Sequence, residues 1–154
     1  MITKKDFSSN YGKIIRMKYL GIDYGEKRVG LAISDDGGQF SFSYKVLKNN
    51  NELIDSIHNI CGEEEIKEIV LGEPEDRNKI YEKVLNFEKK LKEELKLPVY
   101  KEKEFMTSSY SGIQKSKDMF IDRKIKKDKE VKDDSKAATF ILQRFLDKIN
   151  NKNI

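Results

Sequence analysis

The chain has 154 residues, of which 37% are hydrophobic and 38% are charged, and its formal net charge at pH 7 is +4. This length suits one compact domain with a hydrophobic core and is too short for two. One cysteine, Cys61, and one histidine, His58, are too few for a zinc site, and they make a Cys-His nucleophile pair improbable. Hydrolytic chemistry would therefore depend on carboxylates.

The distribution of charge and hydropathy predicts a cytoplasmic protein that does not enter a membrane. No apolar run approaches the roughly 18 residues that a membrane span requires, and residues 1–16 lack the apolar centre of a signal peptide. Residues 1–20 contain five basic residues and one acidic residue, and residues 115–132 contain eight basic and four acidic ones. Such segregation is typical of a surface for a polyanion, although a solvated loop would explain it as well.

The predicted elements begin after a flexible extension at residues 1–16 and form one domain over residues 17–150. Residues 18–24, 28–34 and 39–47 are predicted strands that turns separate, which gives an antiparallel three-stranded meander. The remaining predicted elements are a helix at 51–61, a strand at 66–72, a helix at 78–96, a strand from 97, an ambiguous helix at 107–120, a basic loop at 121–132 and a helix at 134–149.

Three strands in a meander, followed by alternating helices and strands, predict an α/β fold. The expected architecture is a five-stranded mixed sheet with helices on both faces. The order strand-strand-strand-helix-strand-helix-strand-helix is that of the ribonuclease H-like fold. Because order alone is an analogy between folds, it does not establish an activity.

Asp23 is the first candidate for a functional carboxylate. It follows the apolar run Tyr19-Leu-Gly-Ile, where an ionised group is costly unless something compensates its charge. A divalent metal ion would do so, and Gly21 and Gly25 leave room for an ion or a phosphate to approach the backbone. Taken alone, Asp23 would be read as the residue that ends the strand and opens a turn.

A useful Mg²⁺ site needs further carboxylates, and two acids are candidates. Glu104 follows the last predicted strand, although in the polar stretch Lys101-Glu-Lys-Glu it would be taken alone for a surface charge. Asp134 stands in the first turn of the final helix, where the helix dipole also favours a negative charge.

Four segments carry a family resemblance: residues 17–34 (MKYLGIDYGEKRVGLAIS), 69–74 (IVLGEP), 104–108 (EFMTS) and 134–143 (DSKAATFILQ). In this order they resemble the opening motif, the fourth strand, the Glu-Arg-Leu-Thr-Thr segment and the last helix of the YqgF-type proteins, the first of them almost residue for residue. That family is described as Holliday junction resolvases and as nucleases that mature the 5′ end of 16S ribosomal RNA. The resemblance extends from residue 17 to about residue 149.

The chain also departs from the family pattern in two places. It has Lys103-Glu104-Phe105 where the family usually has Asp-Glu-Arg, so an arginine that could contact phosphate is absent. The glycine-containing loop that follows the fourth strand in the family is shortened to Pro74-Glu-Asp-Arg-Asn.

The resemblance implies a metal-dependent nuclease of the ribonuclease H-like type. In this hypothesis Asp23, Glu104 and Asp134 bind one or two Mg²⁺ or Mn²⁺ ions, which position a water for in-line attack on a phosphodiester bond. The implied contacts to nucleic acid lie in the first turn, beside the carboxylates and in the basic loop: Gly25, Lys27, Arg28, Thr107, Lys126 and Lys127.

The implied substrate is a structured RNA precursor, the 5′ end of pre-16S ribosomal RNA. Branched DNA is the alternative, and a four-way junction would favour a symmetric dimer. We expect a monomer or a weak homodimer. A nucleic-acid-binding module without catalysis is an alternative of another class. An actin-like ATPase, whose phosphate loop resembles Gly21-Ile-Asp-Tyr-Gly, is disfavoured because it needs two such domains and a second Asp-x-Gly loop.

Overall fold

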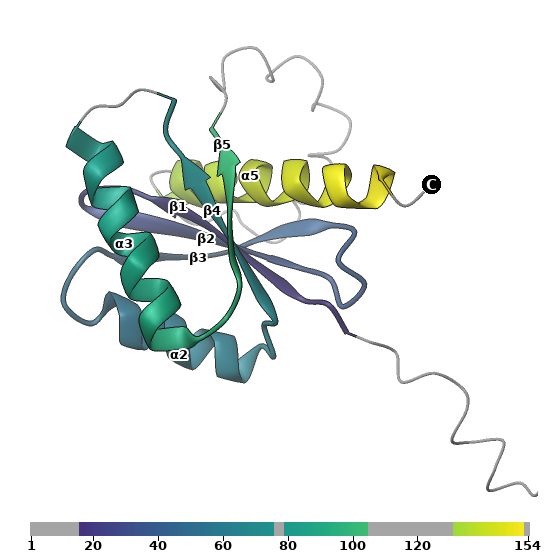
Figure 1. Cartoon of the computed structure of the whole chain (residues 1–154), viewed down its shortest axis with the longest axis horizontal. Helices are drawn as coiled ribbons and strands as arrows, with labels where there is room; N and C mark the ends of the chain where they lie inside the picture. Colours follow the sequence, from purple (N-terminus) through teal and green to yellow (C-terminus); the bar gives the residue numbers. More distant parts are fainter. Residues whose placement is uncertain (1–15, 76–78, 105–130, 153–154) are drawn as a thin grey trace, which may run out of the picture.

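A computed structural model describes residues 16–75, 79–104 and 131–152 (Figure 1). Within these residues the strands form one mixed sheet in the order β3-β2-β1-β4-β5. The first three strands pair as an antiparallel meander, and β4 and β5 run parallel to β1, which confirms the predicted sheet. The strands are β1 (Tyr19–Tyr24), β2 (Arg28–Ser34), β3 (Ser41–Lys48), β4 (Glu68–Glu73) and β5 (Val99–Lys103).

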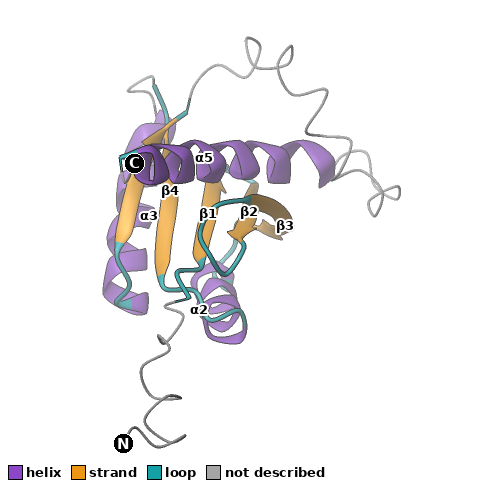
Figure 2. Cartoon of the chain, turned by 90° about the vertical axis from the view of Figure 1, so that its right-hand side faces the viewer, coloured by secondary structure: helices purple, strands orange, loops and turns teal. Residues whose placement is uncertain are grey.

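Helices cover both faces of the sheet, as predicted (Figure 2). The helices α2 (Leu53–Glu63) and α3 (Lys79–Leu95) pack on one face, and α5 (Val131–Asn151) packs on the other. Because the β2 side chains alternate between the faces, Leu31 joins the core under α2 and α3, whereas Ala32 joins the core under α5. None of the helices in the described part of the chain combines the length and the apolar composition that a bilayer crossing requires.

The turn between β2 and β3 is longer than predicted, so β3 begins at Ser41 and not at residue 39. The Asp35 carboxylate accepts hydrogen bonds from the backbone N–H groups of Gln39 and Phe40, both at 2.8 Å, and holds these residues in the turn. Gly38 adopts a positive φ of 65° and donates its N–H to the Asp35 carbonyl. A side-chain cap therefore replaces two residues of predicted strand pairing.

The last helix begins earlier than predicted. It starts at Val131, so residues 131 and 132 belong to α5 and not to the predicted basic loop, and Asp134 lies in the first turn. The expected extension up to residue 15, the expected helix at 107–120 and residues 121–130 of the basic loop lie outside the described residues.

Two glycines allow α5 to lie directly on the sheet. A Cβ atom on Gly21 of β1 would lie 2.7 Å from the Cβ of Leu142 and 3.1 Å from the carbonyl oxygen of Ala138. A Cβ on Gly72 of β4 would lie 2.7 Å from the Cδ1 of Ile141. Real Cβ contacts are essentially never as short as 2.7 Å. A side chain at Gly21 would therefore push α5 away from β1, because the Leu142 Cβ cannot move without the helix, whereas a side chain at Gly72 would displace the end of the Ile141 side chain.

Replacing Gly21 with alanine tests this packing. We expect Gly21→Ala to lower the free energy of unfolding by about 1–3 kcal/mol, because the added methyl group overpacks the contact with α5. Urea unfolding followed by circular dichroism measures the change. The matched control is Gly62→Ala in α2, where a new Cβ meets nothing within 4 Å. The control should be as stable as the wild type or more stable, because alanine is the better helix former, and equal stability of Gly21→Ala and the wild type would contradict the packing argument.

Candidate metal centre

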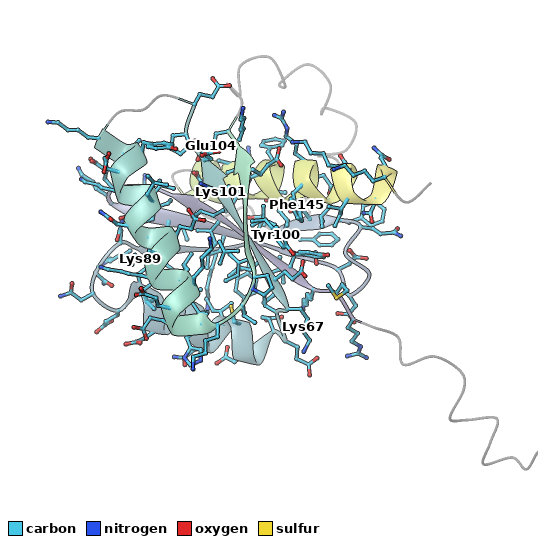
Figure 3. The ribbon with its side chains drawn as sticks, in the orientation of Figure 1. Lys67, Lys89, Tyr100, Lys101, Glu104 and Phe145 are labelled. Carbon is cyan, nitrogen blue, oxygen red and sulfur yellow. The ribbon has the colours of Figure 1, made fainter. Side chains whose placement is uncertain are left out.

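The carboxyl ends of the parallel strands β1, β4 and β5 meet at one edge of the sheet. Asp23 is the next-to-last residue of β1, and Glu104 directly follows β5. The backbone N–H of Glu104 donates to the Glu73 carbonyl oxygen at 2.9 Å, which continues the pairing with β4 beyond the end of the strand. The topology therefore brings two of the three predicted carboxylates to the same edge of the sheet, and Figure 3 shows Glu104 beyond the end of β5.

The carboxyl groups of Asp23 and Glu104 meet above Gly72, and a hydrogen bond joins them. The Oε1 atom of Glu104 lies 2.7 Å from the place that a Cβ of Gly72 would occupy, so the missing side chain makes the space for this carboxyl group. Burial raises the pKa of Glu104 to about 7, and the negative charge and hydrogen bond of Asp23 add to the rise. Glu104 is therefore not the surface charge that its polar neighbours would indicate.

Asp134 is brought towards the same edge by the direction of α5. The ring of Phe145 packs against Tyr19 at the start of β1, with 5.9 Å between the ring centroids, and Ala138 lies against Gly21. The helix therefore runs antiparallel to β1, and the turn before Ala138, which contains Asp134, continues towards the carboxyl end of the strand. The side chain of Asp134 is outside the described part of the structure.

The structure brings two of the three predicted ligands, Asp23 and Glu104, together, and the third ligand stays a prediction. Among the described side chains, no group of three or more His, Cys, Asp or Glu residues is arranged to hold a metal ion. Two carboxyl groups in hydrogen-bond contact at partial burial still fit a hard divalent cation, since such ions take carboxylate oxygens and would replace the proton between them.

Of the predicted phosphate contacts, Gly25 and Lys27 lie in the turn from β1 to β2, and Arg28 is the first residue of β2. Asn49, which sequence reasoning did not select, fixes this turn: its side chain donates to the Gly25 carbonyl at 2.8 Å, and its backbone N–H donates to the Lys27 carbonyl at 2.9 Å. A Cβ on Gly25 would collide with the Arg28 carbonyl oxygen, so the turn requires glycine. Thr107, Lys126 and Lys127 lie outside the described residues.

Two further acids at this end of the sheet are engaged in ion pairs. Glu73 lies 3.6 Å from the Nζ of Lys101. Glu102, which is only 4% exposed, is paired with Arg144 and Lys148 of α5. The spacing of these two basic residues by one helical turn is visible in the sequence, but the acid that they meet lies on a distant strand.

The chain is similar to a known family and to named bacterial proteins. A model of the family described as RuvX: Holliday junction resolvase matches residues 17–148. A protein of Nitratidesulfovibrio vulgaris named "Putative pre-16S rRNA nuclease" is 36% identical over 136 residues, which cover 84% of this chain and 93% of the relative. A protein of Clostridium novyi with the same name is 34% identical over 139 residues and covers 86% of this chain and 100% of the relative.

Two solved structures with a similar fold are resolvases in complex with Holliday junction DNA. T. thermophilus RuvC in complex with Holliday junction substrate gives a TM-score of 0.56 at 16% identity and covers 87% of this chain and 96% of that chain. The Fowlpox virus resolvase in complex with Holliday junction DNA gives 0.55 at 16% identity, with 86% and 99% covered. These similarities concern the fold and confirm the predicted ribonuclease H-like architecture.

The raised pKa of Glu104 predicts a pH dependence of stability. The pKa of about 7 in the folded protein exceeds the ordinary 4.5, so between these values the folded protein binds a proton that the unfolded chain does not. The free energy of unfolding should therefore fall as pH rises from about 5 to 8. Urea unfolding in the presence of a chelator measures it, and Glu104→Gln should remove this part of the slope. Glu94→Gln, at an exposed position of α3, should keep the wild-type slope, and a wild type whose slope matches that of Glu104→Gln would refute the coupling.

Proposed function

This chain belongs to the RuvX family, and from that premise we propose that it is a nuclease that hydrolyses phosphodiester bonds with the help of Mg²⁺ or Mn²⁺. The observation that carries the proposal is the meeting of Asp23 and Glu104 above Gly72. Two partly buried carboxylates repel each other when both are ionised, and this repulsion costs stability unless a cation lies between them. A structural role alone gives no reason to retain such a pair.

In this proposal Asp23, Glu104 and Asp134 hold the metal. A bound Mg²⁺ or Mn²⁺ would supply an activated water and would stabilise the negative charge of the leaving oxygen. The only histidine, His58, lies on α2 and therefore on the opposite face of the sheet from α5, so it is not positioned to act as a general base. The role of the carboxylates would therefore be to hold the cation.

Pre-16S ribosomal RNA is the substrate that we propose, because relatives named for it match at 84–86% of this chain and over 93–100% of their own length. Branched DNA is the second candidate, which the family description and the junction-bound structural neighbours favour. A four-way junction needs two cleavages, so this alternative also favours a symmetric homodimer.

The substrate backbone would cross the sheet beside the carboxylates. Arg28 and Lys48 are partners in the β2–β3 ladder, and both are exposed. The alternation of β2 puts Arg28 on the same face as Ala32, which α5 covers, and its ladder partner shares that face. We therefore extend the predicted phosphate contacts from Lys27 and Arg28 to Lys48.

The first test of the proposal is cleavage. Purified protein should cut a labelled precursor that carries the 5′ end of 16S rRNA, in the presence of Mn²⁺ and not with a chelator. Asp23→Asn and Glu104→Gln should lower kcat/KM by at least about 100-fold. Since Glu104→Gln should also raise stability at pH 8, lost activity could not be ascribed to unfolding. Cleavage of a four-way junction without cleavage of the RNA would support the alternative, and RNA binding without Mn²⁺ binding or cleavage would support a non-catalytic module.

The second test is the salt dependence of binding. Lys48→Gln should weaken binding of the RNA and reduce the slope of log K against log salt concentration by about one, because one phosphate contact is lost. Lys45→Gln is the matched control on the same strand. Lys45 pairs with Leu31, whose side chain joins the core under α2 and α3, so Lys45 lies on the other face of the sheet. Equal effects of the two variants on the slope would argue against a directed contact at Lys48.

A further inference from the structure

Glu102 is a buried carboxylate that the proposed chemistry does not use. It lies in β5, is 4% exposed, and accepts ion pairs from two side chains of α5. The Nε of Arg144 is 3.0 Å from its Oε1, and the Nζ of Lys148 reaches the same oxygen. These contacts tie the edge strand of the sheet to the helix that covers it.

Glu102 lies between Tyr100 and Glu104 on the face of β5 that α5 covers. The ladder partner of Glu102 on β4 is Gly72, so no β4 side chain lies directly opposite Glu102 on the face that α5 covers. Two residues further along, Glu104 continues on the same face, and its carboxyl group fills the space above Gly72. At the start of the strand Tyr100 stacks on Phe145 of α5, with 5.2 Å between ring centroids (Figure 3). The Glu102 ion pairs are therefore the described contact with α5 that lies nearest to Glu104 along β5.

We propose that Glu102 is a positioning residue for the metal site. It holds the end of β5, from which Glu104 projects, against α5, whose first turn contains Asp134. The ion pairs thus hold Glu104 in place relative to the helix that contains Asp134. This inference rests on the proposed metal site and adds to it a residue that touches neither metal nor substrate.

A second buried carboxylate, which contacts the opposite face of β5 from helix α3, provides a control. Glu88 of α3 is 9% exposed and is paired with Lys92 at 2.7 Å and with Lys101 of β5 at 3.6 Å. It also ties β5 to a helix through two basic residues. That helix carries no proposed ligand, so Glu88 should contribute to stability and not to the geometry of the site.

The experiment is a calorimetric titration of Mn²⁺ into the metal-free protein at a temperature well below unfolding. Glu102→Gln should weaken Mn²⁺ binding by about tenfold, the lower end of what is lost when groups that orient metal ligands are removed. Glu88→Gln should change the affinity by less than about twofold, even where thermal unfolding shows that both variants have lost stability.

Arg144→Gln separates positioning from simple charge effects. Removal of the negative charge of Glu102 would weaken cation binding by Coulomb's law alone, whereas removal of the positive charge of Arg144 would strengthen it. If the ion pair positions Glu104, both variants bind Mn²⁺ more weakly. Tighter binding by Arg144→Gln, equal weakening by Glu88→Gln, or unchanged binding by Glu102→Gln would each overturn the inference. A wild type that binds no Mn²⁺ would instead refute the proposed function itself.

Discussion

The close contact between α5 and the centre of the sheet is the constraint on which the fold and the candidate site both depend. Gly21 and Gly72 make this contact possible, because a Cβ atom at either position would come within 2.7 Å of a side chain of the helix. Glycine within a strand costs about 0.5–1 kcal/mol relative to alanine. The contact has two structural consequences. The first turn of α5 is directed towards the carboxyl end of β1, and the space above Gly72 is left for the carboxyl group of Glu104.

The buried and partly buried acids of the described residues differ in what compensates their negative charge. Glu88 and Glu102 are each paired with two basic residues, which is the usual way to compensate a buried negative charge. Glu104, by contrast, is brought against the carboxyl group of Asp23, and its pKa rises to about 7. The acids that are paired with basic residues hold helices to β5. The pair of Asp23 and Glu104, by contrast, lowers the stability of the metal-free protein when both are ionised. This contrast distinguishes a candidate functional pair from structural ion pairs at the same end of the sheet.

Local patterns in the sequence predicted the elements, and non-local contacts decided what the patterns could not. The apolar run between two turns predicted β2 to the residue, and the order of elements predicted the mixed sheet. Asp23 could be selected because it interrupts an apolar run, but Glu104 required the resemblance, since its burial arises from β4 and α5. The start of β3 was wrong because the Asp35 carboxylate caps two backbone groups. The partner of Glu102 could not be predicted, because the sequence does not reveal which strand a helix crosses.

The edge position of β5 explains why side chains and not the backbone control the site. An edge strand has one ladder partner, so its main-chain hydrogen bonds fix it on one side alone. Its remaining restraints come from alternate side chains, which form ion pairs with α5 on one face and with α3 on the other. The charged side chains also discourage pairing with the edge of another molecule. Because Glu104 follows this strand directly, the geometry of the carboxylate pair depends on the same ion pairs that hold the edge of the sheet in place.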